Sequence, residues 1–462
     1  MKGAKDRGRR TRKYTMKNRL SQEFNTHTLI RFAMPTTVML VFMSLYQMVD
    51  GVFVANLEGE NALSALNIVY PVPSAIIAVS IMLATGGSAV IARNMGEKRG
   101  REAKENFTLI IVAGLVVGAA FTVFGLLFLE EIVLALGATP SLYGYCCDYL
   151  RVLLAAALPA VFQMLFQTFF VTAGKPALGL VTTIIGGCVN VVFDYVFIKL
   201  CGMGVTGAAI ATSMGYAVPA LAGLLYFSFN RRGTLCFVRP VFRKGVLLHS
   251  CANGSSEMVN NIAVSITTFI FNRLMLKYAG EAGVAAITVV LYAQFLMTSA
   301  FMGFSGGVAP VISYNYGRRN DAQLRKIFRI SMGAVTAASV LVFAFSELFS
   351  SVVIGVFASP GSEVFRLAKH GFAVFGVNFL FAGLNIYASG MFTAFSDGLV
   401  SAVISFLRTL VFLVVSLLIL PMLLDIDGVW LAVPAAEALA FIVSVYYLVS
   451  RRKKYHYAGK TD

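Results

Sequence analysis

Two acidic residues lie inside long apolar stretches of this sequence, where ionisable side chains are uncommon. Asp50 ends the apolar segment 28–50, and Asp194 lies within the apolar segment 178–199. Asn190 precedes Asp194 by four residues, so the two side chains would share one face of a helix. If these segments cross a membrane, a charge near the bilayer centre is costly, and each such residue is a candidate functional residue.

The oxygen atoms of carboxylates and amides suit two different coupling ions. They are hard ligands of the kind that bind a small cation such as Na⁺. Burial and a neighbouring carboxylate also favour the protonated acid, which suits a proton carrier near neutral pH. Asp50 and Asp194 both fall in the outward-facing part of their expected helices, so they could converge beneath an outward opening. The residues alone leave Na⁺ and H⁺ equally open.

Further charged residues interrupt other apolar segments. Glu257 and Glu437 could each be a second coupling acid or an acid that senses cargo. Glu257 comes near the cytoplasmic end of its segment, where its side chain could equally reach water. Arg408 is expected to neutralise a nearby acid or to cap a cavity, and Arg151 is expected to pair with Asp148 on its own helix.

A third group of polar residues lies in the apolar segment 368–392. Asn378, Asn385 and Tyr387 occur there among phenylalanines. An apolar cavity with a few polar groups suits bulky organic cations, which aromatic faces attract. These residues are therefore candidates for a substrate cavity, and ordinary packing between helices explains them equally well.

A bundle of membrane-spanning helices would position all of these side chains. Of the 462 residues, 58% are hydrophobic and 13% are charged, and the mean hydropathy is +0.78. A soluble globule needs more polar surface than this composition provides. Apolar blocks of roughly 20 residues match the length that crosses a bilayer. The expected spans are 28–50, 62–85, 107–129, 146–170, 178–199, 207–228, 250–275, 284–312, 327–349, 368–392, 399–422 and 429–449.

The net charge of +16 does not indicate nucleic-acid binding, because of where the charges lie. Nine Lys or Arg residues precede the first span, four form the run 451–454, and the aromatic residues sit mostly inside apolar blocks. Alternate loops carry most of the other basic residues, which predicts that both termini are cytoplasmic. The six cysteines have no metal-ligand spacing and are expected to be packing residues.

An internal repeat divides the chain into two halves. At an offset of 221 residues, GGSAVIARNMG from Gly86 aligns with GVAPVISYNYG from Gly307, so that Asn94 matches Asn315. Each half holds six spans, so both halves enter from the same side, and we expect lobes related by a pseudo-two-fold axis along the membrane normal. The expected regions are a basic tail 1–27, an N-lobe 28–228, a cytoplasmic linker 229–245, a C-lobe 246–450 and a basic tail 451–462.

Several strings resemble the multidrug and toxic compound extrusion (MATE) transporters. The strings are YQMVDGVFVANL (46–57), GGCVNVVFDYVFI (186–198), GVTGAAIAT (204–212) and the two repeat segments, which fit a loop of each half in that family. The likeness extends over essentially the whole chain and favours the bacterial branch of DNA-damage-inducible and staphylococcal-type exporters. The turn 173–176 departs from the pattern, since it lacks an Asp that the turn 396–398 keeps.

The resemblance implies a secondary active exporter of organic, often cationic, compounds. It implies exchange for Na⁺ or H⁺ by alternating access of two lobes, with no other cofactor. In similar members a first-helix Asp, a fifth-helix Asn and Asp and a sixth-helix Thr bind the coupling cation. The matching positions here are Asp50, Asn190, Asp194 and Thr212, which form a possible Na⁺ site. We expect a monomer in the bacterial plasma membrane, with small organic substrates and the lipid bilayer as its partners.

Two other kinds of membrane protein remain as alternatives. A lipid or lipid-linked oligosaccharide flippase of the same superfamily would share the lobes, but it would place cationic residues in its cavity to hold phosphates. The intramembrane ionisable residues here are mainly acidic, which favours cationic cargo. A polytopic enzyme such as a prenyltransferase would need paired acidic motifs for Mg²⁺-diphosphate. The pair Asp425 and Asp427 stands alone in an outer loop, so we expect no enzymatic activity.

Overall fold

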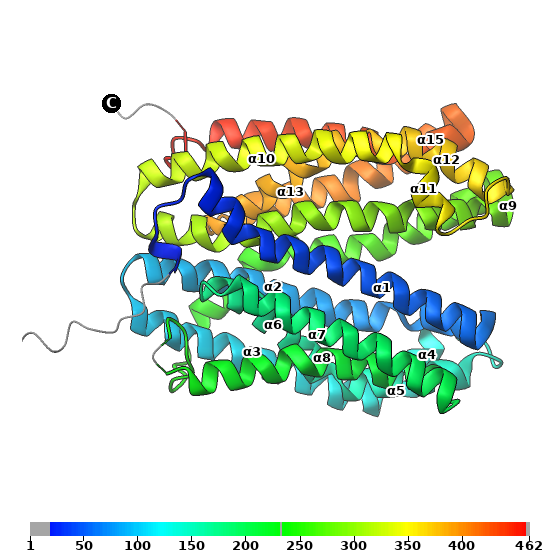
Figure 1. The fold of residues 1–462 in the computed structure, drawn as a ribbon, viewed down its shortest axis with the longest axis horizontal. Coiled ribbons are helices and arrows are strands. Elements are labelled where there is room, and N and C mark those ends of the chain that lie inside the picture. The colour runs from blue at the N-terminus through cyan, green and yellow to red at the C-terminus, as the bar shows by residue number, and fades with distance from the viewer. Residues whose placement is uncertain (1–18, 232, 459–462) are drawn as a thin grey trace, which may run out of the picture.

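The computed structural model describes residues 19–231 and 233–458, except for the side chains of residues 50–64, and within these residues it contains helices and no strand. The helices run side by side along the long axis of the molecule (Figure 1). The first half comprises η2 (Arg19–Ser21), α1 (Thr26–Val69), α2 (Pro71–Gly96), α3 (Gly100–Leu127), α4 (Leu129–Ala135), α5 (Tyr143–Ala155), α6 (Ala157–Thr172), α7 (Pro176–Asp194), η3 (Tyr195–Leu200) and α8 (Gly204–Phe229). The second half comprises α9 (Lys244–Gly317), α10 (Asp321–Leu348), α11 (Ser350–Gly355), α12 (Glu363–Gly376), α13 (Phe379–Ala394), α14 (Gly398–Phe406), η4 (Leu407–Phe412) and α15 (Leu413–Ser450).

The described residues contain twelve spans, as the sequence predicted. Eight helices are long and apolar enough to cross a membrane, and the bent pairs α5–α6 and α12–α13 pass the same test when each pair is taken together. Two of the eight contain a break, α9 and the continuous helix of α14, η4 and α15 (Gly398–Ser450), because the backbone leaves the helical region at Gly280 and at Asp425. The end of α2 packs against both ends of α9, so the chain reverses at Gly280. Each arm of these two broken helices counts as one span, and so does each bent pair, which gives twelve spans.

The second span was misplaced in the sequence analysis. It covers Pro71–Gly96 rather than 62–85, and residues 62–69 continue α1. Pro71 begins α2 because proline is favoured in the first turn of a helix, where its missing N–H has no partner to lose. The repeat segments 86–96 and 307–317 are consequently the last turns of α2 and α9 rather than loops.

The two lobes, α1–α8 (N-lobe) and α9–α15 (C-lobe), meet through glycines that the repeat relates. A Cβ atom added to Gly96 would lie 2.0 Å from the carbonyl oxygen of Tyr314. One added to Gly317 would lie 2.2 Å from the carbonyl oxygen of Arg93. Residues 93 and 96 match residues 314 and 317 at the offset of 221. The pseudo-two-fold axis therefore relates the two contacts, and at both of them the backbones of the two lobes touch. Gly96 and Gly317 are called the glycine mates below.

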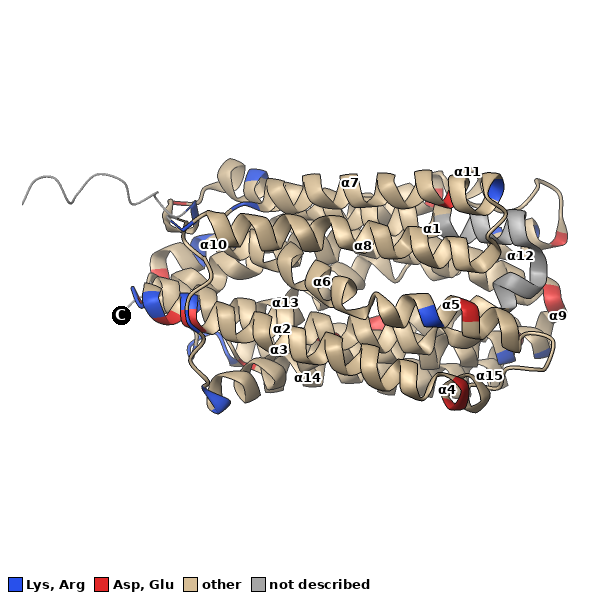
Figure 2. Cartoon of the chain, turned by 90° about the horizontal axis from the view of Figure 1, so that it is seen from below, with Lys and Arg blue, Asp and Glu red and all other residues tan. Residues whose placement is uncertain are grey.

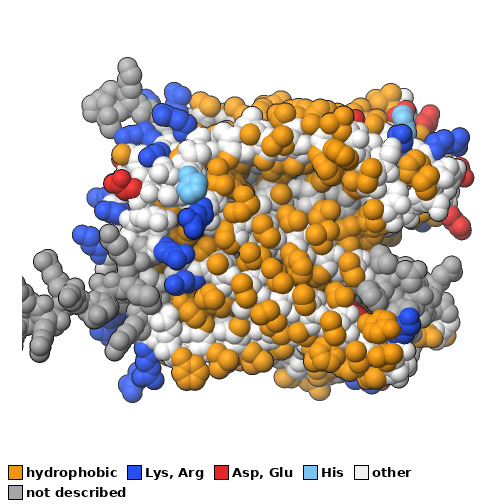
Figure 3. Space-filling model, viewed as in Figure 1, with side chains coloured by type: hydrophobic (Ala, Val, Ile, Leu, Met, Phe, Trp, Pro, Cys, Tyr) orange, Lys and Arg blue, Asp and Glu red, His pale blue; other side chains and the backbone are white. Residues whose placement is uncertain are grey.

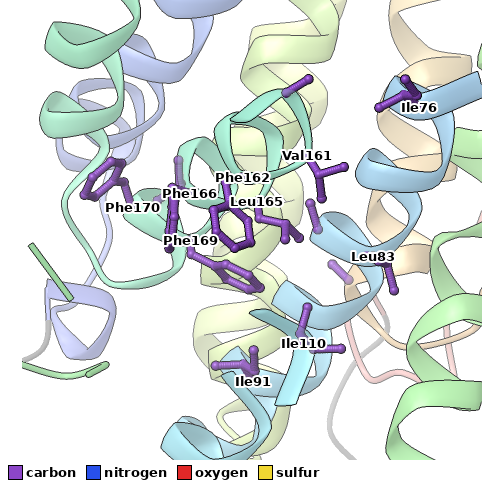
Figure 4. Packing of buried hydrophobic residues seen from close by; sticks show 14 of the residues in the cluster. Ile76, Leu83, Ile91, Ile110, Val161, Phe162, Leu165, Phe166, Phe169 and Phe170 are labelled. Carbon is purple, nitrogen blue, oxygen red and sulfur yellow. The ribbon is translucent and has the colours of Figure 1, made fainter. Parts of the chain in front are cut away.

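Phenylalanines form much of the N-lobe core. Phe166 and Phe169 on α6 lie close to the aliphatic side chains of α2 and α3, including Ile110 (Figure 4). Phe107 links this group to α8, with its ring centroid 5.1 Å from that of Phe169 and 4.7 Å from that of Phe227. Burying large aromatic rings fixes α6 in the middle of its lobe.

The exterior carries a broad hydrophobic band between two polar ends (Figure 3). Most Lys and Arg residues lie toward one end of the bundle, and many Asp and Glu residues lie toward the other (Figure 2). The described chain begins and ends at the basic end (Figure 1). A helical bundle with such a band is a multi-pass membrane protein, because the band supplies the apolar surface that faces lipid.

Candidate ion-coupling site

Small residues let α7 and α8 approach each other closely at the centre of the N-lobe. A Cβ atom on Gly186 would lie 2.7 Å from the carbonyl oxygen of Gly215. One on Gly215 would lie 3.1 Å from the Cβ atom of Asn190. Helices in membranes pack tightly where small residues allow their backbones to touch. The crossing therefore places Asn190 directly against α8.

Asn190 and Thr212 face each other across this crossing. The Asn190 Nδ2 atom donates a hydrogen bond of 3.4 Å to the Thr212 Oγ1 atom. Asn190 is buried and Thr212 is half-buried. The Asn190 Oδ1 atom has no hydrogen-bond partner among the described residues. A buried amide oxygen without a partner is costly, and it is available to a cation.

Asp194 follows Asn190 by one helical turn and is fully buried. It is the last residue of α7, and the chain continues into the π-helical segment η3. Short π-helical segments interrupt regular helices most often at functional sites. The structure thus brings together Asn190, Asp194 and Thr212, three of the four residues that the sequence indicated.

The fourth residue, Asp50, has a side chain that lies outside the described residues. Its helix α1 packs against α7, since a Cβ atom on Gly187 would lie 2.7 Å from the Phe42 ring and 3.0 Å from the Tyr46 ring. Gly187 is one turn before Asn190 on α7. The first helix is therefore adjacent to the helix that carries Asn190 and Asp194.

A carboxylate, an amide oxygen and a hydroxyl form a set of hard oxygen donors. Such donors suit Na⁺, and a buried carboxylate can alternatively carry a proton. Within the described residues no three His, Cys, Asp or Glu side chains are grouped as a metal site would need. The donor chemistry therefore fits a small monovalent cation or a proton better than a transition metal.

Two of the substrate-cavity candidates lie in the packed interior of the C-lobe. Asn378 lies at the 56° bend between α12 and α13, and its Nδ2 atom donates a 2.6 Å hydrogen bond to the carbonyl oxygen of Phe375. The same carbonyl oxygen accepts the backbone N–H of Asn378 at 3.0 Å, so the side chain adds a second bond at the bend. Tyr387 is 1% exposed and packs with its ring centroid 6.5 Å from that of Phe304.

The candidate Asn385 belongs to a buried ionic cluster in the C-lobe. The Arg408 Nε atom lies 2.7 Å from the Glu437 Oε1 atom, so Arg408 neutralises a nearby acid as predicted. Asn385 donates from Nδ2 to the Glu437 Oε2 atom at 2.7 Å. Ser444 then donates to the Asn385 Oδ1 atom at 2.8 Å, a contact that sequence reasoning missed. Asn385, Arg408, Glu437 and Ser444 are called the C-lobe cluster below.

Glu257, the remaining candidate, is half-buried on the first arm of α9. Asn260 and Arg408 are the described groups that interact electrostatically with its carboxylate. Glu257 thus lies beside the C-lobe cluster rather than with Asp194. The predicted local pair of Arg151 and Asp148 is present at 3.9 Å, with both side chains more than half exposed.

A repeated hydrogen bond links the fourth and fifth spans of each lobe. The Gln167 Nε2 atom donates to the Thr183 Oγ1 atom at 2.8 Å, and Ser389 and Ser405 are joined at the same distance. Both residues of the second pair come 222 positions after those of the first. Sequence reasoning missed this pair, because unlike residues occupy the matching positions.

Twelve spans in two lobes related by a pseudo-two-fold axis, with polar clusters buried inside both lobes, define a polytopic membrane protein built from parallel repeats. The chain belongs to the MatE family of multidrug efflux transporters, whose sequence model matches residues 35–196 and again residues 258–418. The two matches fall one in each lobe.

Relatives of known name are similar over nearly the full length. The multidrug export protein MepA of Staphylococcus saprophyticus is 22% identical over 429 residues, covering 92% of this chain and 94% of the relative. The protein of the same name from Staphylococcus haemolyticus is 21% identical over 430 residues, with the same coverage.

Solved structures have the same fold. An outward-facing multidrug resistance MATE family transporter of the MOP superfamily superposes with a TM-score of 0.89 at 24% identity, over 95% of this chain and 98% of that one. A MOP superfamily transporter from Pyrococcus furiosus also gives 0.89 at 24% identity, over 97% of this chain and all of that one.

Proposed function

We propose that this protein exports organic compounds, often cationic, in exchange for Na⁺ or H⁺. Asp50, Asn190, Asp194 and Thr212 would form the coupling site, with no further cofactor. The observation that carries the proposal is the contact of buried Asn190 with Thr212 across the α7–α8 crossing, one turn from fully buried Asp194. The multidrug export proteins to which the chain is similar support organic cargo.

Alternating access would use the contact between the lobes. The glycine mates Gly96 and Gly317 close one end of the bundle, and this is the end that carries most basic residues. The positive-inside rule supports a cytoplasmic location for that end and for both termini. Rocking of the lobes about such a contact would open the site to one side at a time. We expect a monomer in a bacterial plasma membrane, and the relatives do not favour the flippase alternative.

Ethidium efflux from proteoliposomes tests the proposal directly. Wild type, Asp194→Asn and Asp148→Asn would be compared under an imposed Na⁺ gradient and then under an imposed proton gradient. Asp148 is a matched control because its side chain is exposed at 56%. Loss of gradient-driven efflux in Asp194→Asn alone would support the coupling site and would name the ion.

Two results would contradict the proposal. Efflux that Asp194→Asn leaves unchanged would remove the coupling role of this residue. Well-folded wild type that moves no ethidium under either gradient would overturn export of that cargo and would bring the flippase function forward.

A further inference from the structure

Two groups of the C-lobe cluster contact the Glu437 carboxylate, one at each of its oxygens. Glu437 Oε1 receives the guanidinium of Arg408, and Glu437 Oε2 receives the amide of Asn385. The Asn385 Nδ2 atom also donates to the backbone oxygen of Glu437 at 2.9 Å. The Asn385 Oδ1 atom accepts from Ser444, so the amide is satisfied on both of its atoms. Both carboxylate oxygens of Glu437 and the amide oxygen of Asn385 thus already have a donor from the protein.

The C-lobe cluster occupies the same helix pair of its lobe as the candidate coupling site. Arg408 lies on the fifth span of the C-lobe and Glu437 on the sixth, as Asn190 and Thr212 lie on the fifth and sixth spans of the N-lobe. Gly204 begins the sixth span of the N-lobe, and Gly428 follows the break at Asp425 that begins the sixth span of the C-lobe. Thr212 comes eight residues after Gly204, and Glu437 comes nine residues after Gly428. The two polar contacts are therefore at similar depths in the two lobes.

The basic residue is present in one lobe only. No Lys or Arg occurs between Lys175 and Lys199, or between Lys199 and Arg231, which covers the interior of the fifth and sixth N-lobe spans. Arg408 lies inside the fifth span of the C-lobe, with 13% of its side chain exposed. A buried guanidinium beside a buried carboxylate favours the ionised form of both groups.

We propose that Arg408 is a tethered counter-cation, which takes in the C-lobe the place that the exchangeable coupling ion takes in the N-lobe. Glu437 then stays ionised and bound throughout the transport cycle, and it exchanges neither H⁺ nor Na⁺. Arg408 is a positioning residue that limits coupling to one lobe and so fixes the number of ions exchanged per cargo molecule. This inference rests on the proposed antiport function.

The charged and titratable groups around Glu437 come from each helix packed on it. Arg408 comes from η4, Glu257 approaches Arg408 from α9, and α13 contributes Asn385 together with Tyr387 two residues further on. Arg408 is the cation of this group, and the 2.7 Å contact assigns it to Glu437 rather than to Glu257. Its removal would leave Glu437 as a buried acid without a counter-ion, which would take up a proton or a cation.

Infrared spectroscopy of the full chain in lipid tests the inference without any transport. Wild type, Arg408→Met, Arg408→Lys and Arg408→Met/Glu437→Gln would be compared in Na⁺-free buffer near neutral pH. A new carbonyl band of a protonated carboxyl group is expected in Arg408→Met. The band that belongs to Glu437 should be absent from wild type, from Arg408→Lys, which keeps the charge, and from the double variant, which lacks Glu437 and keeps Glu257 beside position 408.

Counting ions per cargo gives a second readout that a purely structural ion pair would not change. Arg408→Met is expected to exchange one more coupling ion per ethidium than wild type. Arg408→Lys and the double variant should both keep the wild-type count. The double variant also shows whether a neutral pair folds, since it buries no unpaired charge.

The outcomes separate this inference from the proposed function. A protonated-carboxyl band already present in wild type and lost in the double variant would overturn the role of Arg408, as would an unchanged band and ion count in Arg408→Met. Wild type that moves no ethidium under any gradient contradicts the antiport function, while the infrared bands still decide whether Arg408 holds Glu437 ionised.

Discussion

In each lobe the last two spanning helices pack closely, and the first of them contains a six-residue π-helical segment, η3 in the N-lobe and η4 in the C-lobe. The polar groups between these helices differ. In the N-lobe, Asn190 contacts Thr212 and leaves its Oδ1 atom without a described partner. In the C-lobe, Arg408 and Asn385 occupy both oxygens of Glu437. The two π-helical segments are not at matching positions, because η4 begins about ten residues before the position that the 222-residue offset gives for the start of η3. The duplicated helix pair has thus taken a different local backbone and different buried polar chemistry in the two lobes.

The difference follows from what each position must do. Gly96 and Gly317 touch the opposite backbone, so any side chain there would prevent the contact, and the repeat keeps both glycines. Gln167 with Thr183 and Ser389 with Ser405 join the same spans with different residues, because any donor and acceptor of suitable length can serve. The polar clusters are constrained only by local charge balance, which an exchangeable ion or an arginine can each provide.

The largest expected effect comes from neutralising one acid in each lobe. Glu437→Gln leaves the Arg408 guanidinium buried without its partner, which should destabilise the protein by about 3–5 kcal/mol. Asp194→Asn removes a fully buried charge and leaves no Lys or Arg inside the fifth or sixth span without a partner, so it should not destabilise the protein in this way. The single tryptophan, Trp430, is fully buried in the C-lobe, so its fluorescence during thermal unfolding measures the destabilisation by Glu437→Gln.

Restoring charge balance provides the control for this pair. Arg408→Met/Glu437→Gln should recover most of the lost stability, since neither charge remains buried alone. Equal destabilisation by Glu437→Gln and Asp194→Asn would show that the two lobes do not differ in the way described.

Much of the architecture was predictable because it depends on patterns within single helices. Apolar length gave the twelve spans, and the four-residue spacing of Asn190 and Asp194 placed both on one face. The start of the second span was misplaced because apolar residues continue across Tyr70 into α2, so that hydropathy alone shows no boundary there.

The C-lobe cluster was only partly predictable. Arg408 inside an apolar segment required an acid, but nothing local identified Glu437, which comes from another helix. Asn385 and Ser444 lie on two helices separated by 59 residues, and their contact depends on how α13 and α15 pack. Periodicity predicts the face of one helix and not which faces of distant helices meet.

A second prediction tests whether the glycine mates act alike. Gly96→Ala and Gly317→Ala each place a methyl group within about 2 Å of a backbone oxygen of the other lobe, and each should cost about 1–3 kcal/mol in the closed state. The lobes should then separate at this end. Cys251 follows Ser250, whose carbonyl oxygen lies against Gly86 of the other lobe. Cys251 should therefore react several-fold faster with a maleimide in both variants, as measured by peptide mass spectrometry.

Gly333→Ala is the matched control, because a Cβ atom at Gly333 would meet no atom within 4 Å. It should leave the labelling rate at the wild-type value. A large effect at Gly96 with none at Gly317 would argue against a symmetric contact between the lobes.

The third prediction compares the chain segments that cover the basic end of each lobe. Thr234 of the linker donates to the carbonyl oxygen of Ala173 at the α6–α7 turn. Tyr455 of the C-terminal segment donates to Asp397 at the equivalent α13–α14 turn, and its ring stacks on Phe395 with centroids 4.7 Å apart. Burial, followed by the hydrogen bond to Asp397, raises the pKa of Tyr455, so the phenol stays protonated and keeps donating.

Tyr455→Phe removes the hydroxyl and keeps the stacked ring, so it should weaken the attachment of the segment by about 1.5–2 kcal/mol, as for other hydrogen bonds to charged groups. Thr234→Val loses a bond to a neutral oxygen and should cost about 0.5–1.5 kcal/mol. Hydrogen exchange of residues 451–458 and of the linker measures each loss separately. Unchanged protection of residues 451–458 in Tyr455→Phe would show that the Tyr455 hydroxyl does not hold this segment, whose other contacts include the bond from Tyr457 to the carbonyl oxygen of Leu448.

The smallest expected effect concerns the hydroxyl of Thr212. Thr212→Val keeps the shape of the side chain but removes the acceptor of the Asn190 amide, which is worth about 0.5–1.5 kcal/mol. If Thr212 helps to hold the coupling ion, the ion concentration that gives half-maximal efflux should rise about 2- to 10-fold, in addition to this small loss of stability. Ser213→Ala is the control on the adjacent position, since Ser213 bonds only within its own helix to the carbonyl oxygen of Ala209. An equal shift in both variants would assign the effect to α8 as a whole, whereas a shift in Thr212→Val alone would sharpen the contrast between an open N-lobe site and a closed C-lobe cluster.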